Sequence, residues 1–395
     1  MTALPSPSGT PADRTPGAGP LDGIIVADFA RVLAGPYATM LLADLGATVI
    51  KVESPEGDDT RSWMPPSYRN QASYFQAVNR NKHSIVLDLK DEDDRQTARQ
   101  IAARADVFIH NFKPGSIERL GFGYEDVRAL NESIIYAHIS GFGTKGGAEL
   151  PGYDVLVQGM AGLMDMNGEP DGDPVRSGIS LFDLTTGMMT ALGITAAVRH
   201  RDLTGEGQLI ENNLMSNAVF TMLNQYQSAA THNAVPTRGG KEHATIYPYH
   251  ALPTGDGELI IVGANNGQFA RLSAELGHPE WAQDERFDSP EKRNVNRGEL
   301  RPLLEEALSH KGKEEWFRQL RAAGLPCSPV QNVGEGLRTA IELGLDPVWH
   351  TEDPDSVATI RNSLSMSATP PSYRKEPPAL GEDGEAIRAW LASEC

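Results

Sequence analysis

The chain has little cysteine and no long apolar run. Its 395 residues contain two cysteines, Cys327 and Cys395, so no disulfide framework is implied and a reducing compartment fits. No uninterrupted apolar run reaches the about 18 residues that a membrane span requires. The first twenty residues lack the apolar stretch of a signal peptide and the repeated arginines of a transit peptide. We therefore expect a cytoplasmic protein with a disordered tail over residues 1–20.

Several signatures of common enzyme classes are also missing. The sequence contains no Gly-x-Gly-x-x-Gly and no P-loop, which removes the usual phosphate cradles of NAD, FAD and ATP. The ten histidines never occur at His-x-x-x-His spacing, and no paired cysteine motif occurs, so no metal site is predicted. No Gly-x-Ser-x-Gly elbow of a serine hydrolase is present. A Rossmann-type oxidoreductase stays a rival interpretation, which an absence of NAD binding would exclude.

Acidic residues outnumber basic ones. The formal net charge is -18 at pH 7, and such a surface repels nucleic acid phosphates and anionic lipid, so we expect neither nucleic acid nor membrane as a partner. An anionic ligand in a local basic pocket is still possible, because salt screens distant charges.

The first part of the chain alternates strands and helices. Residues Gly23–Phe29 and Thr48–Glu53 are short apolar runs typical of buried strands. Between them, Pro36 suits the first turn of a helix that ends before Gly46. This βαβ unit predicts a parallel sheet and an α/β fold. The rhythm continues with strands expected at Ile85–Leu89, Asp106–Asn111 and Ile134–Ile139, and helices at Glu92–Ala105 and Tyr124–Leu130.

The pattern changes after about residue 225. Tyr247–Leu252 and Glu258–Val262 flank Thr-Gly-Asp-Gly, a hairpin signal, and helices are expected over 267–276, 297–309 and 313–323. The proline-rich end of the chain predicts an extended segment that lies on something larger. The sequence therefore predicts a tail over 1–20, a large domain over 21–225, a small α+β domain over 226–325, and a return segment over 326–395 that completes the large domain.

Two positions could carry chemistry. Asp183 follows a strand-like run, Ile179–Phe182, and precedes Leu184, Met188 and Leu192, which share one helix face. Asp183 could be a helix N-cap, or it could be a carboxylate held between apolar residues as a nucleophile. Arg31, in the loop after the first strand, could bind a phosphate or be an ordinary solvated arginine.

Six stretches together resemble the class III CoA-transferases. They are Leu21–Glu53, Asn79–Lys90, Asp106–Val127, Gly152–Met164, the Asp183 segment and Thr204–Met215. Two further segments, Gly57–Trp63 and Arg238–Phe269, are similar to the succinate–hydroxymethylglutarate subgroup of this family. The resemblance covers the chain from about residue 20 to its C-terminus.

The resemblance implies a fold and a mechanism. The family has a Rossmann-like large domain and a smaller domain, and two subunits form an interlocked homodimer. Asp183 aligns with the aspartate that attacks the acyl-CoA, giving a mixed anhydride and then an aspartyl-CoA thioester. The subgroup implies succinyl-CoA as donor and a dicarboxylic acid as acceptor, with no resident cofactor and no metal.

The resemblance also implies which residues of this chain bind CoA and the substrate, because they occupy the positions of the family's binding residues. Those implied for CoA are Arg31, Val32, Leu33, Ala34, Leu87, Asp88, Lys90, Asn111, Phe112, Lys113, Arg119 and Tyr153. The loop implied to cover the substrate contains Arg238, Gly239, Gly240, Lys241 and His243; an ordinary surface turn is its alternative. Arg61, Arg176, Arg238 and His243 could grip the acceptor's distal carboxylate or form surface ion pairs. Ser54 and Pro151 stand where formyl-CoA transferase has arginine and lysine, so the contacts with CoA must differ in detail.

Two related functions stay open. The α-methylacyl-CoA racemases share the fold and carry a Gly-His-Asp stretch where this chain has Gly152-Tyr153-Asp154. Tyrosine, with a pKa near 10, is a poor general base at neutral pH, which disfavours that reaction. A catalytically silent CoA-binding protein is the other alternative, against which the presence of Asp183 argues.

Overall fold

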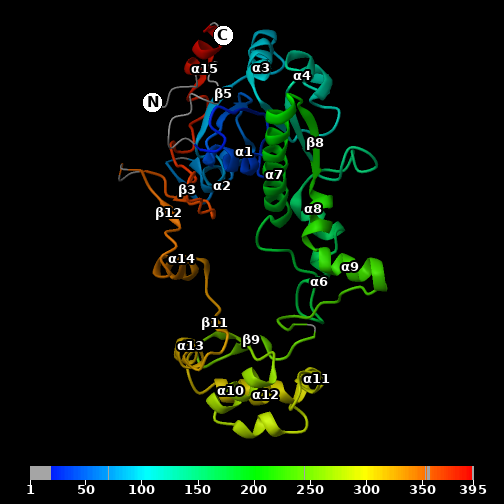
Figure 1. Cartoon of the computed structure of the whole chain (residues 1–395), viewed down its shortest axis with the longest axis vertical. Helices are drawn as coiled ribbons and strands as arrows, with labels where there is room; N and C mark the ends of the chain where they lie inside the picture. Colours follow the sequence, from blue (N-terminus) through cyan, green and yellow to red (C-terminus); the bar gives the residue numbers. More distant parts are fainter. Residues whose placement is uncertain (1–18, 70, 244, 352, 354–355, 394–395) are drawn as a thin grey trace. The chain divides into compact units, whose positions relative to one another are not determined.

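The computed structural model describes residues 19–393 except 70, 244, 352 and 354–355 (Figure 1). Its contacts divide the chain into two compact units, one within 1–161, 177–234 and 346–395, the other within 162–176 and 235–345. Residues 162–176 and 326–345 therefore group with the second unit, whereas the sequence analysis expected them in the large domain and the return segment. The predicted tail lies almost wholly outside the described residues.

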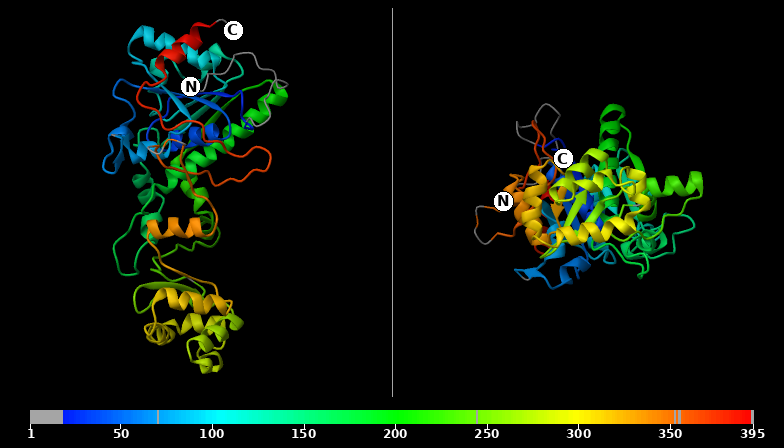
Figure 2. Two further views of the ribbon diagram at one scale, coloured as in Figure 1. Left: turned by 90° about the vertical axis from the view of Figure 1, so that its left-hand side faces the viewer. Right: turned by 90° about the horizontal axis from the view of Figure 1, so that it is seen from below.

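The first unit is built on a six-stranded parallel sheet with the order β5-β2-β1-β6-β7-β8 (Figures 1 and 2). Its strands are β1 (Ile25–Asp28), β2 (Thr48–Glu53), β5 (Lys82–Val86), β6 (Val107–His110), β7 (Ile135–Ser140) and β8 (Gln208–Asn213). The main helices are α1 (Ala34–Asp44), α3 (Glu92–Arg104), α4 (Tyr124–Leu130), α7 (Leu181–Thr204) and α15 (Gly384–Ala392). The predicted α/β class with a parallel sheet is confirmed.

Different helices cover the two faces of this sheet. On one face, strand residues such as Ala27, Ile50 and Phe108 share a buried core with α3, α4 and α15. On the other face, α1 and α7 contact each other, α1 contacts β1 and β2, and α7 contacts β7 and β8. Because both faces are covered, the central strands place apolar residues on both faces, such as Val26 and Ala27 of β1, which made them recognisable in the sequence.

The face that α1 covers also holds buried charges. Lys82 Nζ lies 3.2 Å from Asp28 Oδ2 and donates to the carbonyl oxygen of Pro36 and to Asn79 Oδ1, both at 2.9 Å. Thr39 of α1 donates to Asp28 at 2.6 Å. Burial lowers the pKa of Lys82 to about 8. These partners allow a lysine to begin β5, which is why the predicted limits of Ile85–Leu89 are wrong.

Helix α7 is the central helix of this unit. By length and composition alone it could cross a membrane, although polar residues such as Asp183 and Thr190 interrupt its apolar sequence. It contacts α1, β7, β8, α5 (Asp154–Met160) and α8 (Leu214–Thr221), and Phe182, Ile194 and Val198 of α7 are buried. We interpret α7 as a core helix of the first unit.

The C-terminal segment returns to the first unit. The backbone N–H of Ser372 donates to the carbonyl oxygen of Asp44 at 2.8 Å, and that of Asn81 donates to Lys375 at 2.9 Å. Arg104 of α3 donates to the carbonyl oxygen of Trp390 at 2.7 Å. The predicted extended segment therefore lies on α1, β5 and α3 of its own chain.

The second unit contains a three-stranded antiparallel sheet in the order β11-β10-β9. Its elements are β9 (Tyr249–Pro253), β10 (Glu258–Val262), α10 (Asn266–Glu275), α11 (Pro290–Val295), α12 (Arg297–Leu308), α13 (Lys313–Ala322), β11 (Cys327–Pro329), α14 (Val333–Glu342) and α6 (Leu163–Met166). Their core includes Leu259, Phe269, Leu304 and Trp316. The predicted hairpin and the three predicted helices are confirmed within about two residues.

Smaller elements complete the described chain. They are β3 (Ser67–Tyr68), β4 (Gln71–Ala72), α2 (Ser73–Ala77), α9 (Leu223–His232), β12 (Val348–Trp349) and β13 (Thr359–Ile360).

Candidate functional site

The loop after β1 is held in an unusual conformation. Val32 has φ +69°, which is strained for a β-branched residue, and its N–H points at the carboxylate of Asp58, 3.3 Å away. Lys51 pairs with Asp58 at 2.8 Å, and both side chains are buried. Asn111 holds the neighbouring Arg31 by accepting from its N–H and donating to its carbonyl oxygen. The predicted residues Arg31, Val32 and Asn111 are therefore brought together at the carboxyl edge of the sheet.

A groove of about 240 Å³ lies at the same edge. It is lined by Phe29, Val52, Glu53, Ser54, Pro55, Glu56, Leu87, Asp88, Leu89, Lys90, Phe112 and Leu120. Four of these, Leu87, Asp88, Lys90 and Phe112, are predicted CoA residues. Open α/β sheets bind ligands in crevices at the carboxyl ends of their strands, so the groove is a candidate ligand site.

Lys90 lines this groove, and Arg31, Lys113 and Arg119 are next to lining residues in space or in sequence. The side chain of Lys90 is exposed and makes no ion pair among the described residues. The Arg31 guanidinium lies 5.5 Å from the centre of the Phe112 ring. Arg119 donates to Ser116 at 3.1 Å, while Lys113 is paired with Glu149 on the surface. An anionic ligand would thus meet Lys90 without having to break an ion pair first.

Asp183 lies in the first turn of α7. The helix begins at Leu181 with Ser180 as its N-cap, so the interpretation of Asp183 as the N-cap is wrong, as is the strand expected at Ile179–Phe182. The capping group comes from another element. Oδ1 of Asp154, the first residue of α5, accepts from the N–H groups of Phe182 at 2.7 Å and Asp183 at 3.0 Å. Asp154 therefore fixes the turn that carries Asp183.

Apolar side chains connect this turn to the first loop. Val32 and Leu33 pack in one cluster with Tyr74 of α2 and with Leu184, the residue after Asp183. One turn further along α7, a Cβ on Gly187 would lie 2.7 Å from the carbonyl oxygen of Ala34. Only glycine allows so close an approach of α7 to the start of α1. The fold thus brings Asp183 and the predicted residues Val32, Leu33 and Ala34 into one neighbourhood.

The Asp183 carboxyl group is electrostatically disfavoured as an anion. Burial, and then the negative charge of Asp154, raise its pKa from 3.8 to about 7. A helix N-terminus favours a carboxylate by only about 0.3–1 kcal/mol, which is too little to offset a rise of this size. Burial, with the charges of Asp183 and Asp154, also raises the pKa of Tyr74, whose hydroxyl contacts Ser180. A poorly solvated carboxylate of this kind is suited to nucleophilic or general-base chemistry.

We expect Asp183→Asn to stabilise the protein in a pH-dependent way. Below pH 3.8 the Asp183 carboxyl group is protonated in the folded and in the unfolded protein, so it does not lower the free energy of unfolding. Between pH 3.8 and about 7 only the unfolded state ionises, so wild-type loses stability, and above pH 7 the loss is complete. The free energy of unfolding of Asp183→Asn should exceed that of wild-type by about 2–4 kcal/mol at pH 8.

Chemical denaturation at pH 4 and pH 8 measures this difference. Asp202→Asn, at the exposed C-terminal end of the same helix, is the matched control and should change stability by less than about 0.5 kcal/mol at both pH values. An Asp183→Asn protein no more stable than wild-type at pH 8 would contradict the described environment.

Tyr153 and the predicted covering loop each have surroundings of their own. Tyr153 is 64% exposed at the N-cap of α5. The predicted covering loop lies in the second unit, where Gly240 has φ +61° and donates to the carbonyl oxygen of Gly168, and Arg238 contacts Asp165. In the same loop, the His243 ring packs edge-on against Tyr249, and Lys241 pairs with Glu258.

Arg61 is not available to an acceptor acid. It forms a two-point ion pair with Glu53, at 2.8 and 2.7 Å, donates to the carbonyl oxygen of Pro378 and covers the Phe75 ring at 3.7 Å. The suggestion that Arg61 grips a distal carboxylate is therefore corrected. In the described parts of the chain no group of three His, Cys, Asp or Glu side chains could hold a metal ion.

Comparison with known proteins identifies the family. Residues 21–384 match CoA-transferase family III. A succinate–glutarate CoA-transferase of Agrobacterium fabrum is 38% identical over 390 residues, covering 94% of this chain and 96% of that protein. An acetyl-CoA:oxalate CoA-transferase of Acetobacter aceti is 36% identical over 379 residues, covering 95% and 96%.

The structure agrees with these matches. The crystal structure of a CAIB/BAIF family protein from Brucella suis superimposes with a TM-score of 0.89 and 40% identity, covering 95% of this chain and 100% of that one. The chain therefore belongs to CoA-transferase family III and is a CoA-transferase.

Proposed function

We propose that this enzyme moves CoA from succinyl-CoA to a dicarboxylic acid, glutarate being the first candidate, and that Asp183 carries CoA covalently between the two acids. The observation that supports the covalent role is the poorly solvated Asp183 carboxyl group, fixed by Asp154 beside the loop after β1. The name of the Agrobacterium relative supports the substrates. The Acetobacter relative, at similar identity, is named for acetyl-CoA and oxalate, so the acids need a direct assay.

The chemistry proceeds through two acyl transfers on one carboxylate. The Asp183 carboxylate attacks the thioester carbonyl carbon, the C–S bond breaks, and a mixed anhydride and CoA thiolate form. The thiolate then attacks the aspartyl carbonyl carbon, so that succinate leaves as its carboxylate and an aspartyl-CoA thioester remains. The acceptor carboxylate reverses both steps and leaves with CoA. Water must be kept away because it would hydrolyse both intermediates.

We further propose that CoA lies in the groove at the carboxyl edge of the sheet. Its phosphates would meet Lys90, Arg31 and Arg119, and its adenine would lie against apolar side chains such as Leu87 and Phe112. The loop of Arg238, Gly239, Gly240, Lys241 and His243 would exclude water from the reacting centre, since its glycines permit movement and close approach.

A homodimer is the proposed working form. The α7 side chains Met188 and Leu192 are 46% and 61% exposed, and the α14 side chains Val333 and Ile341 are 92% and 56% exposed. Apolar surface of this kind is usually covered by a partner. We propose that a second copy covers it in the interlocked manner of the family; a monomeric mass by light scattering would contradict this.

Substitution of Asp154 should separate its capping role from its charge. Asp154→Asn keeps an oxygen that can accept from Phe182 and Asp183 but removes the like charge, so the pKa of Asp183 should fall. The acid limb of the pH profile of kcat/KM should then move to lower pH by about one unit. Asp154→Ala also removes the cap, and we expect kcat to fall by about 10–100-fold. Identical pH limbs for wild-type and Asp154→Asn would contradict the electrostatic role.

Lys90→Ala tests whether the groove binds the acyl-CoA. Because Lys90 has no ion-pair partner among the described residues and lines the groove, its loss should raise KM for the acyl-CoA by about tenfold with little change in kcat. Lys145→Ala, an exposed lysine outside the groove, is the control. An unchanged KM would remove Lys90 from the CoA site.

The substrates are tested by a transfer assay with chromatography and mass spectrometry. The protein is incubated with succinyl-CoA and, separately, with glutarate, hydroxymethylglutarate, malate, citramalate, itaconate, mesaconate or oxalate. A new acyl-CoA with a dicarboxylate supports the proposal and identifies the acceptor. No new acyl-CoA from succinyl-CoA with any of these acids would contradict the proposed substrates.

A further inference from the structure

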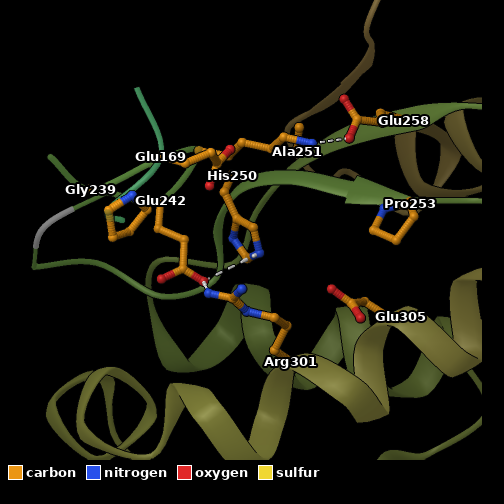
Figure 3. Close-up of a pocket in the computed structure, with 11 residues that line it drawn as sticks. Glu169, Gly239, Glu242, His250, Ala251, Pro253, Glu258, Arg301 and Glu305 are labelled. Carbon is orange, nitrogen blue, oxygen red and sulfur yellow. Dashed lines mark hydrogen bonds and ion pairs between the residues drawn. The ribbon is translucent and has the colours of Figure 1, made fainter. Parts of the chain in front are cut away.

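The second unit contains a polar pocket of about 380 Å³ of its own (Figure 3). Its walls come from β9, β10, α12 and two loops. The lining residues are Glu169, Pro170, Gly239, Lys241, Glu242, His250, Ala251, Pro253, Glu258, Arg301 and Glu305. All of them belong to the second unit. Gly239 and Lys241 are part of the loop proposed to exclude water, whereas His250, Glu169 and Glu305 have no part in the chemistry proposed for Asp183.

The buried side chain of His250 has no hydrogen-bond partner. Only 6% of this residue is exposed, and neither ring nitrogen has a partner among the described residues. The nearest carboxylate oxygen, Oε1 of Glu242, lies 3.9 Å from Nε2, beyond hydrogen-bonding distance. Burial lowers the pKa of His250 to about 4, so at neutral pH the ring offers one donor and one acceptor to the pocket. An unpaired buried polar group is costly, so the His250 ring favours a molecule in the pocket that can donate to it or accept from it.

Both cations that line the pocket are already engaged. Arg301 pairs with Glu242 (Figure 3). Arg297 also contacts Glu242, at 2.9 Å, and Lys241 pairs with Glu258. An anionic ligand would therefore have to displace a glutamate from its partner.

Two lining carboxylates, in contrast, lack such partners. Glu169 and Glu305 form no ion pair with any described residue, although, after the hydrogen bond to Glu258, their negative charges help to raise the pKa of the nearby Lys241. In Figure 3, the Glu305 side chain extends from α12 toward the side of the pocket formed by β9. The pocket thus offers one neutral imidazole and two carboxylates that form no ion pair with the described residues, a set that complements a ligand with several N–H donors and positive charge.

We propose that this pocket binds a small aliphatic amine, whose ammonium groups pair with Glu169 and Glu305 and donate to His250. A bare metal ion does not suit it, because no three potential ligands are grouped there within the described residues. The ammonium ion supplies the donors that the carboxylates and the imidazole need, and it leaves the Lys241 and Arg301 pairs intact. The proposal is independent of the acids that the enzyme uses.

Isothermal titration of the full-length protein with putrescine tests the proposal at constant ionic strength. We expect saturable binding of one putrescine per chain. Glu305→Gln should weaken it at least about fivefold, since one charge pair is lost. Glu306→Gln, the next residue on α12 and not part of the pocket, should bind like wild-type. Asp183→Ala should also bind like wild-type.

Three results would overturn the proposal. They are no saturable heat with putrescine, equal affinity in Glu305→Gln and wild-type, and binding of sulfate that Arg301→Gln removes. The last result would show an anion site in place of an amine site.

Discussion

Asp183→Ala is expected to lower the rate of CoA transfer by at least about 10³-fold, because the proposed mechanism carries CoA between the two acids on the Asp183 carboxylate. The turn that holds Asp183 is capped by Asp154, which stays in place in the variant. The substitution removes an electrostatically disfavoured carboxyl group, so the free energy of unfolding should not fall. The loss of rate is therefore expected without a loss of stability.

The measurement is kcat for succinyl-CoA with the acceptor found in the transfer assay. Binding of CoA should be nearly unchanged in Asp183→Ala, since the groove lies at other residues. Asp202→Asn, on the same helix, is the control and should retain wild-type kcat. Retention of more than a few per cent of wild-type transfer by Asp183→Ala would exclude Asp183 as the nucleophile.

Asp44→Ala is expected to destabilise the first unit by about 3–5 kcal/mol, because it leaves the buried Arg80 without its anion. Asp44 is fully buried at the end of α1 and accepts from Arg80 at two points, at 2.8 and 2.6 Å. Asn81 and Asn362 also donate to its carboxylate, at 3.0 and 3.1 Å. One carboxylate thus connects α1, the start of β5 and the C-terminal segment.

Hydrogen exchange locates this effect, since a two-unit protein need not unfold in one step. Amide protons of Asn81 and Ser372, which bond across the same contact, should exchange faster in Asp44→Ala. Glu125→Ala removes an exposed pair with Arg128 and should change stability by less than about 1 kcal/mol. Equal exchange at Asn81 and Ser372 in wild-type and Asp44→Ala would contradict the role of Asp44.

The fold was predictable where burial and sequence pattern agree. The limits of β2 and α4 are those expected, because the β-branched residues Val49, Ile50 and Val52 indicate a buried strand and α4 begins directly after Gly123. Strand β5 was misplaced because Lys82 and Ser84 are buried only through distant partners, Asp28 and Glu53. Strand β8 was missed since it is polar and largely exposed.

The site was predictable from the resemblance more than from local pattern. Local sequence left Asp183 between an N-cap and a nucleophile, and the cap proves to come from Asp154, 29 residues earlier. Asp154, Tyr74 and Asp58 were missed as supports because only tertiary packing brings them to Asp183 and Val32. An acidic residue after a tyrosine gives no local signal of capping a distant helix. The cytoplasmic location stays a prediction.

The most direct test of the central claim is mass spectrometry of the wild-type enzyme after incubation with succinyl-CoA alone. We predict a CoA adduct on the peptide that contains Asp183, discharged when the acceptor acid is added and absent from Asp183→Asn. Turnover without any adduct, or an adduct on another residue, would contradict an aspartyl-CoA intermediate at Asp183.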